Sequence, residues 1–412
     1  MKIAKLLAAV CVFFVAEAFA ADDWVSAWAM SHNARGTTPA MAGRTVRMIL
    51  TPSVAGDALR VKIENTMGEA PVAITGATLA RAAESAGLDA KSIVRLTFAG
   101  KPGLTLAPGA GAYSDAVEFK VKARERIALS LEVESASDIS MHHVGLRTNW
   151  SAAGARAGDP ASAGFEPLPE VPPANSGQWP YYWVAALDVR AKDAGGAIVL
   201  FGDSITDGRC STRDAGGTVR ADIDQRWGDV FAARLAAKGN KKAVAITSIS
   251  GNRIIDRGNG PSALERLDRD VLDRAGVTHV VLFEGTNDLA GDFTAEQVIA
   301  GIEEIAKRVR ARGLKIIGAT VIPRGRPAPT PGWSKEKEAQ RKALNAWMRT
   351  RAPLDGVIDF DALMRGGPVV TMADGSDAPS IPSEWNCDHT HPNAAGYKAM
   401  GEFVDLKLFE RK

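Results

Sequence analysis

The chain has 412 residues, and 50 Lys and Arg against 48 Asp and Glu leave a formal net charge of +2. Apolar residues make up 46% of it, which with so small a net charge excludes a chain that is disordered throughout. No Lys/Arg block of the kind that marks a nucleic-acid partner is present, and three cysteines in so long a chain exclude a small disulfide-stapled module.

Residues 1–20 have the pattern of a secretory signal peptide. Lys2 and Lys5 precede an apolar run over residues 6–15, and Ala-Phe-Ala at 18–20 supplies the small residues of a cleavage site. The run is too short for a membrane-spanning helix, which needs about 20 apolar residues. We therefore expect no transmembrane segment and an exported protein, either secreted or periplasmic.

Residues 21–193 are expected to form an N-terminal β-sandwich-like domain. Apolar and polar residues alternate over 59–64, 117–121 and 127–133, and Gly, Pro, Asp and Ser separate the runs at short intervals. Short strands with this spacing are typical of an antiparallel sandwich. Residues 151–180 are rich in Ala, Gly, Ser and Pro with little periodicity, and we predict a long loop there.

From residue 194 to 412 the pattern changes to short apolar runs that alternate with helical segments. The predicted strands are 197–201, 243–249, 278–283, 315–322 and 356–360. The predicted helices are 226–238, 262–275, 294–312, 335–351 and one that follows Pro392. This order predicts an α/β domain with a five-stranded parallel sheet covered by helices on both faces. Because the connection between the two domains is short, we expect them to pack together.

Polar residues follow several of these strands, where the active residues of open α/β sheets gather. A serine becomes a nucleophile when an imidazole takes its proton and a carboxylate orients that imidazole, and Ser204, His391 and Asp388 fit these roles. The oxyanion of a tetrahedral intermediate needs hydrogen-bond donors. The backbone N–H groups of Ser204 and Gly251 and the side-chain amide of Asn287 are the candidates.

These residues lie in four blocks that resemble those of the SGNH (GDSL) hydrolases. The blocks are Gly202-Asp203-Ser204, one centred on Gly251, Gly285-x-Asn287-Asp288, and Asp388-x-x-His391. The resemblance implies a three-layer α/β/α fold and a serine esterase that needs no metal or organic cofactor. It also assigns Ser204 as nucleophile, Gly251 and Asn287 as oxyanion donors, Asp388 as orienting acid and His391 as base.

With its N-terminal β-domain the chain looks like a secreted bacterial branch similar to rumen xylan-esterase-like and arylesterase proteins. This implies a small-molecule or polysaccharide ester as substrate, with short acyl groups on carbohydrate or aryl alcohols. Two alternatives stay open, a lipase- or lysophospholipase-type acylhydrolase and a non-catalytic glycan-binding protein. The sequence does not determine the natural ester or the oligomeric state.

Other polar residues near these blocks and in the β-domain also have expected roles. His389 is a second candidate for the base, although the three-residue step from Asp388 favours His391. Asp207 is expected to bond loop backbone and Glu284 to be structural. We expect His142 and His143 on a face of the β-domain and not in a metal site, because no metal-binding motif accompanies them.

Export would leave two cysteines, Cys210 and Cys387, in an oxidising compartment. If Ser204 and His391 are in contact, the loops that carry these cysteines converge at one end of the sheet. We therefore predict a disulfide beside the active site. Two buried free thiols are the alternative, since cysteine also packs as a small apolar residue.

Overall fold

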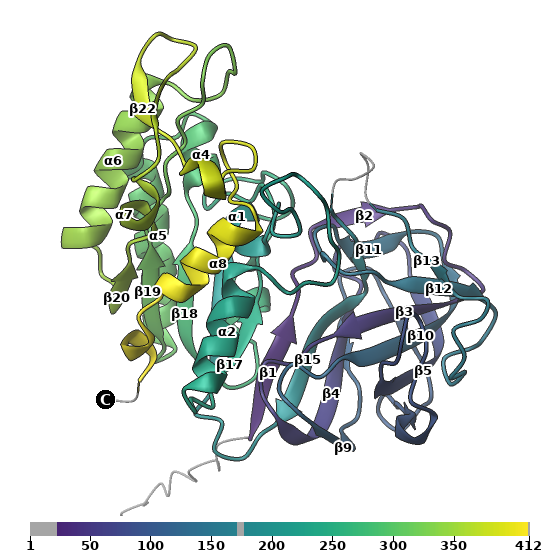
Figure 1. Ribbon diagram of the computed structural model, residues 1–412. Helices are drawn as coiled ribbons and strands as arrows, with labels where there is room; N and C mark the ends of the chain where they lie inside the picture. Colours follow the sequence, from purple (N-terminus) through teal and green to yellow (C-terminus); the bar gives the residue numbers. More distant parts are fainter. Residues whose placement is uncertain (1–22, 171–176, 411–412) are drawn as a thin grey trace, which may run out of the picture.

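The computed structural model describes residues 23–170 and 177–410, which form two domains in direct contact (Figure 1). The predicted signal peptide, residues 1–20, lies outside the described residues. Among the described helices, none combines the length and the apolar character that a membrane span requires.

The N-terminal domain consists of antiparallel sheets. The first has the order β1 (Trp24–Ala29), β15 (Val184–Arg190), β4 (Gly56–Glu64) and β8 (Gly111–Tyr113), with β9 (Val117–Val121) also paired to β4. The second has the order β13 (Glu166–Pro167), β12 (Trp150–Ala153), β3 (Arg44–Leu50), β10 (Ile127–Ala136), β5 (Val72–Arg81) and β6 (Val94–Arg95), with β7 (Leu104–Leu106) also on β5. A third, small sheet has the order β14 (Tyr181–Tyr182), β11 (Ile139–His142) and β2 (Ala34–Gly36).

The two large sheets share one apolar core, as the predicted sandwich requires. Leu59, Val61 and Ile63 of β4 and Leu129 and Leu131 of β10 all belong to it and are fully buried. Alternate residues of a strand point to one face, so the period-two pattern of the sequence places these side chains between the sheets.

The segment predicted as a long loop, 151–180, contains more structure than its composition suggests. Most of β12 lies in it, and β12 pairs with both β3 and β13. Such pairing uses backbone hydrogen bonds and does not depend on particular side chains, so the Ala- and Ser-rich sequence of this segment did not predict it. The expected loop is therefore partly strand.

The C-terminal domain is built on a parallel sheet of five strands, which confirms the predicted α/β class. Its order is β17 (Ala243–Ile246), β16 (Ala197–Gly202), β18 (Val277–Phe283), β19 (Lys315–Ala319) and β20 (Gly356–Ile358). Its helices are α1 (Ser204–Asp207), α2 (Trp227–Ala237), α3 (Ala263–Leu267), α4 (Thr286–Ala290), α5 (Ala295–Ala311), α6 (Lys335–Thr350), α7 (Phe360–Met364) and α8 (Ala394–Phe403). A hairpin of β21 (Val369–Thr371) and β22 (Asp377–Pro379) precedes α8.

Shorter helical segments complete the two domains. Turns of 3₁₀ helix occupy Ala90–Ser92, Ser383–Trp385 and Leu406–Phe409, and a π-helical turn over Asp268–Leu272 continues α3.

Helices cover both faces of the parallel sheet because each buried strand is apolar on both sides. Along β16, Ile198 and Leu200 pack in the cluster that contains α2 and α8, whereas Val199 and Phe201 pack in the cluster that contains α5 and α6. Buried residues of α5 recur at helical spacing, and Thr294 caps its first turn through the N–H of Gln297. These three layers are the fold that the resemblance implied.

The two domains meet along β1 and the first sheet of the β-domain (Figure 1). The N–H of Ser26 in β1 donates to the carbonyl of Ala275, and the Ser53 hydroxyl donates to the carbonyl of Val244 in β17. Ala29 of β1 is part of the apolar cluster of the C-terminal domain. The short connection thus joins domains that share buried contacts, as expected.

Candidate active site

Ser204 lies at the carboxyl end of β16, where the chain turns into the single-turn helix α1. The carboxylate of Asp203 accepts the N–H of Ile205 and caps this turn. Gly208, with φ of +93°, ends it in the left-handed region that glycine adopts without strain. The turn holds Ser204 in place, and this side chain is almost fully buried.

His391 joins Ser204 to Asp388 in one hydrogen-bonded chain. The Ser204 Oγ lies 2.7 Å from His391 Nε2, and His391 Nδ1 lies 2.9 Å from Asp388 Oδ2. Burial would raise the pKa of Asp388, but hydrogen bonds from His391 and its backbone hold that pKa well below its usual range. Asp388 is therefore a carboxylate that can only accept, so Nδ1 of His391 carries the proton and Nε2 accepts from the serine hydroxyl.

The imidazole of His391 is in the neutral form that a base requires. Burial lowers the pKa of His391 below 6.5, and it outweighs the opposing effect of Asp388. His389, the other candidate base, lies apart from the serine: its Nδ1 contacts the side-chain amide of Asn386 at 3.0 Å. The structure thus brings His391, and not His389, to Ser204.

Gly251 and Asn287 line the same cavity as Ser204, Asp388 and His391, and this cavity has a volume of about 310 Å³. One N–H of the Asn287 amide donates to the carbonyl of Asn252 at 2.9 Å, which leaves the second N–H for a ligand. Gly251 has φ of +79°, and a Cβ there would lie 2.4 Å from Asn259 Nδ2. The sequence-predicted residues are therefore assembled around one cavity.

The predicted disulfide is present. Cys210 and Cys387 are bonded, with 6.4 Å between their Cα atoms and a sequence separation of 177. It links the loop after α1 to the loop that carries Asp388 and His391.

Cys210, Asp388 and His391 also have their potential ligand atoms within 4.8 Å of one another. A metal ion would need a free thiolate at such a site, but the sulfur of Cys210 is already bonded to Cys387. This cluster therefore does not fit a metal site.

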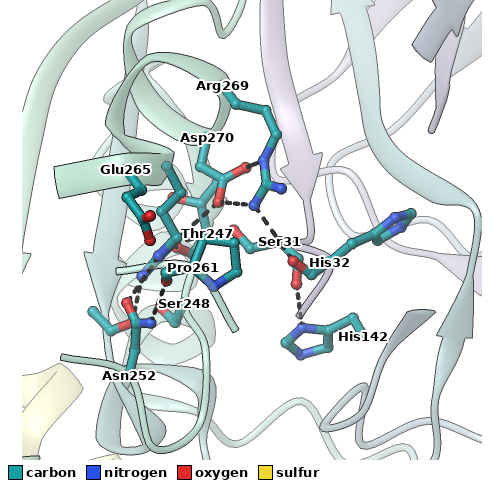
Figure 2. Close-up of polar contacts among 12 residues, drawn as sticks. Ser31, His32, His142, Thr247, Ser248, Asn252, Pro261, Glu265, Arg269 and Asp270 are labelled. Atoms are coloured by element: carbon teal, nitrogen blue, oxygen red, sulfur yellow. Dashed lines mark hydrogen bonds and ion pairs between the residues drawn. The ribbon is translucent and has the colours of Figure 1, made fainter. Parts of the chain in front are cut away.

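A histidine of the β-domain contacts α1, the turn that carries Ser204. His142 ends β11, is fully buried, and its Nε2 lies 2.9 Å from Asp207 Oδ1 in α1. Its Nδ1 donates to the carbonyl of Ser31 at 2.7 Å (Figure 2). Nδ1 donates to a carbonyl, whereas Nε2 lies at ion-pair distance from the Asp207 carboxylate without the geometry of a hydrogen bond. The nearby negative charge favours the imidazolium form of the ring. Burial lowers the pKa of His142, but Asp207 and the hydrogen bonds raise it above its ordinary value.

Asp207 connects this histidine to the loop of Gly251. Its Oδ2 accepts the N–H of Ser250 at 2.9 Å and the Ser250 hydroxyl at 2.7 Å. Asp207 thus bonds loop backbone, as expected from the sequence, and in addition binds the β-domain. Sequence reasoning placed His142 in the β-domain but missed this contact, because nothing local in the sequence links it to Asp207.

Behind the turn lies a buried ionic cluster around Arg266. Its guanidinium donates to Glu284 at 3.3 Å, to Asp270 at 3.2 Å and to the carbonyl of Gly202 at 3.1 Å. Figure 2 shows Arg269 beside Asp270, at the boundary with the β-domain. Glu284 is thus held in the interior away from the cavity, which agrees with the structural role expected for it.

Part of this chain is similar to known proteins. No curated protein matches the chain significantly. Solved structures that are similar include a GDSL-like lipase from Bacteroides thetaiotaomicron (20% identity, 52% of this chain and 88% of the other, TM-score 0.37). A carbohydrate acetylesterase family member from Sinorhizobium meliloti (22%, 50% and 94%, TM-score 0.37) and an acetyl xylan esterase (17%, 50% and 96%, TM-score 0.36) are also similar.

The family comparison is the more informative one. Residues 200–399 match the GDSL-like lipase/acylhydrolase family. The match begins in β16, just before Ser204, and ends within α8, so it includes each residue of the hydrogen-bonded chain. The C-terminal domain of this chain is therefore a member of the GDSL-like lipase/acylhydrolase family, and the protein is a hydrolase.

Proposed function

We propose that this protein is a serine esterase that hydrolyses carboxylic esters through an acyl-enzyme. The observation that carries the proposal is the chain of hydrogen bonds from Ser204 through His391 to Asp388. It provides a nucleophile, a neutral base already in contact with it, and a carboxylate that fixes the base in the required tautomer.

A residue of the site can then be assigned to each step of the reaction. Ser204 attacks the ester carbonyl while His391 Nε2 takes the hydroxyl proton, and Asp388 stabilises the imidazolium that forms. The N–H groups of Ser204, Gly251 and Asn287 would bind the oxyanion. His391 then gives its proton to the leaving alcohol, and in the second half it activates water to release the acid.

The cavity supports a polar substrate. None of the described residues that line it has an apolar side chain, since all are glycine or carry hydroxyl, amide, imidazole or charged groups. A long acyl chain would find no apolar surface there to bury, and this burial is the main source of affinity for lipids. We therefore favour short acyl groups on carbohydrate or aryl alcohols over the lipase-type alternative.

We also propose that the protein is exported to the periplasm or the medium. The signal-like pattern of residues 1–20 supports this. The disulfide between Cys210 and Cys387 supports it as well, because such bonds persist mainly in oxidising compartments.

Hydrolysis of 4-nitrophenyl acetate by the wild type and by Ser204→Ala tests the activity. We expect the variant to lose at least about 1,000-fold in kcat, whereas Ser162→Ala, an exposed serine of the β-domain, should keep full activity. If wild type and Ser204→Ala release chromophore at equal rates, the chain is not a serine esterase, and the glycan-binding alternative gains support.

A further inference from the structure

One wall of the active-site cavity is strongly basic. Arg209, Arg324 and Arg326 line it together with Ser204. The only carboxylate among the described lining residues is Asp388, and its oxygens already accept from the imidazole and the backbone of His391. The cavity thus has an excess of positive charge beside the nucleophile.

The three arginines have no acidic partner in the described part of the chain. Across residues 23–170 and 177–410, no Asp or Glu oxygen lies within 4.0 Å of their guanidinium nitrogens. In contrast, arginines close by in space form ion pairs, such as Arg253 with Asp256 at 3.1 Å. Arginines outside a binding site are usually exposed or paired, and Arg324 is neither.

Arg324 is 5% exposed, yet its contacts are neutral. Its Nη1 donates to the Thr286 hydroxyl at 2.6 Å, and its guanidinium lies 5.0 Å from the ring of Trp333. Its Nε has no hydrogen-bond partner among the described residues, and the same is true of Arg326 Nε. Arg326 Nη2 donates to the Thr390 hydroxyl, next to His391.

The buried Arg324 and the half-buried Arg326 also repel each other. Burial, together with the charge of Arg326, lowers the pKa of Arg324 to about 10. The charges of Asp203 and Asp388 oppose this lowering from a distance, but neither carboxylate lies within 4.0 Å of the Arg324 guanidinium. The two guanidiniums thus lie close together without a direct ion pair. A bound anion would relieve this repulsion, and the planar forks of two arginines suit a carboxylate, which accepts several N–H bonds at once.

Stabilisation of the reaction's oxyanion does not account for all three arginines. The N–H groups of Ser204, Gly251 and Asn287 already provide three candidate donors for it. For a neutral ester, these donors alone would be enough to bind the oxyanion. The additional positive charge therefore points to a group on the substrate that is negative before the reaction begins.

We propose that the preferred substrate of this site is a carboxylate-bearing ester, bound by Arg209, Arg324 and Arg326. This inference rests on the proposed esterase function and specifies its substrate class. The carboxylate belongs either to the alcohol, as in an acylated uronic acid or hydroxybenzoate, or to the acyl group, as in the half-ester of a dicarboxylic acid.

Two matched pairs of esters test the proposal and distinguish these sources. 4-Acetoxybenzoate against methyl 4-acetoxybenzoate places the charge on the alcohol. 4-Nitrophenyl hemisuccinate against 4-nitrophenyl methyl succinate places it on the acyl group. Since charge-assisted hydrogen bonds are roughly twice as strong as neutral ones, we expect kcat/KM for the charged member of one pair to exceed that of its neutral partner about 10- to 100-fold. The preference should appear mainly as a lower KM for the charged ester, and it should decrease at high salt concentration.

Arginine variants assign the preference to this wall. Arg326→Gln and Arg209→Gln should each reduce the charged-to-neutral ratio of kcat/KM about 10-fold, and Arg326→Lys should reduce it less. Arg257→Gln is the control, because Arg257 is exposed, pairs with Glu265 and does not line the cavity. Its ratio should equal that of the wild type.

The proposal is overturned if the wild type shows no charged preference in either pair while it hydrolyses the neutral esters. It is also overturned if the arginine variants slow charged and neutral esters equally, because the arginines would then act on the reaction itself. Failure of the esterase function gives a different result, namely Ser204-independent hydrolysis or none with any of the four esters.

Discussion

Replacing His142 by Phe should weaken the whole protein and its activity, although this residue belongs to the β-domain. His142 and Asp207 are both fully buried and lie 2.9 Å apart. Phe has a ring slightly larger than the imidazole and leaves the Asp207 carboxylate without its counter-ion. Removal of one member of a buried ion pair typically costs about 3–5 kcal/mol of stability.

The effect on activity follows from the second oxygen of Asp207. This oxygen holds the backbone N–H and the hydroxyl of Ser250, which precedes Gly251. A displacement of about 1 Å in a catalytic group can cost about 100-fold in rate. We therefore expect kcat of the folded His142→Phe variant to fall about 10- to 100-fold, with a smaller change in KM.

Urea unfolding and ester hydrolysis under native conditions measure the two effects. His143→Phe is the matched control, since His143 is half-buried and adjacent in sequence, and it should lose less than about 1 kcal/mol. The double variant with Asp207→Asn should recover part of the stability lost in His142→Phe, because the unpaired charge is gone. A loss below about 1 kcal/mol in His142→Phe would refute the importance of the pair.

The ion pair of His142 and Asp207 also predicts how the stability of the protein depends on pH. The pKa of His142 is raised in the folded protein, so its contribution to stability is complete below pH 6.5 and is lost as the pH rises through the folded-state value. The difference in unfolding free energy between wild type and His142→Phe should therefore be largest in mild acid and shrink in alkaline solution. A difference that grows with pH would show that the imidazolium is not the stabilising form.

Three further predictions concern the site itself. The acidic limb of kcat/KM against pH should have its midpoint below 6.5, because burial lowers the pKa of His391 and activity needs the neutral base; a midpoint above 6.5 would contradict this. Reduction of the bond between Cys210 and Cys387 should lower the unfolding free energy by about 2–5 kcal/mol, as measured by urea unfolding with and without reductant; equal midpoints would contradict it. Asn287→Ala should lower kcat about 100- to 1,000-fold with little change in KM in steady-state assays, since one oxyanion donor is removed; an unchanged kcat would show that Asn287 serves only the Asn252 carbonyl.

The fold and the triad could be predicted because their signals are local or follow from strand order. Each strand of the parallel sheet is a short apolar run, and each long helix has a periodic apolar face. Ser204, Gly251 and Asn287 directly follow such runs, and parallel strands end at one edge of the sheet. Their approach to one another therefore required no knowledge of side-chain packing.

The basic wall was missed although a signal for it existed. Arg324 and Arg326 follow the fourth strand, β19, at the same edge of the sheet as Ser204. The rule that identified Gly251 and Asn287 applies equally to this strand end. The sequence could not show that these two arginines lack acidic partners, because that depends on which loops fold over them.

The contact between His142 and Asp207 had no such signal, and it changes the role expected of the β-domain. Arg266 donates to the carbonyl of Gly202 in the nucleophile strand and also to the Ser31 hydroxyl of the β-domain. The ion pair of His142 and the hydrogen bonds of Arg266 thus both connect the β-domain to the backbone that positions the serine. A detachable sugar-binding module would need neither contact, whereas a support for the nucleophile turn needs both. The domain is therefore best understood as part of the scaffold of the active site.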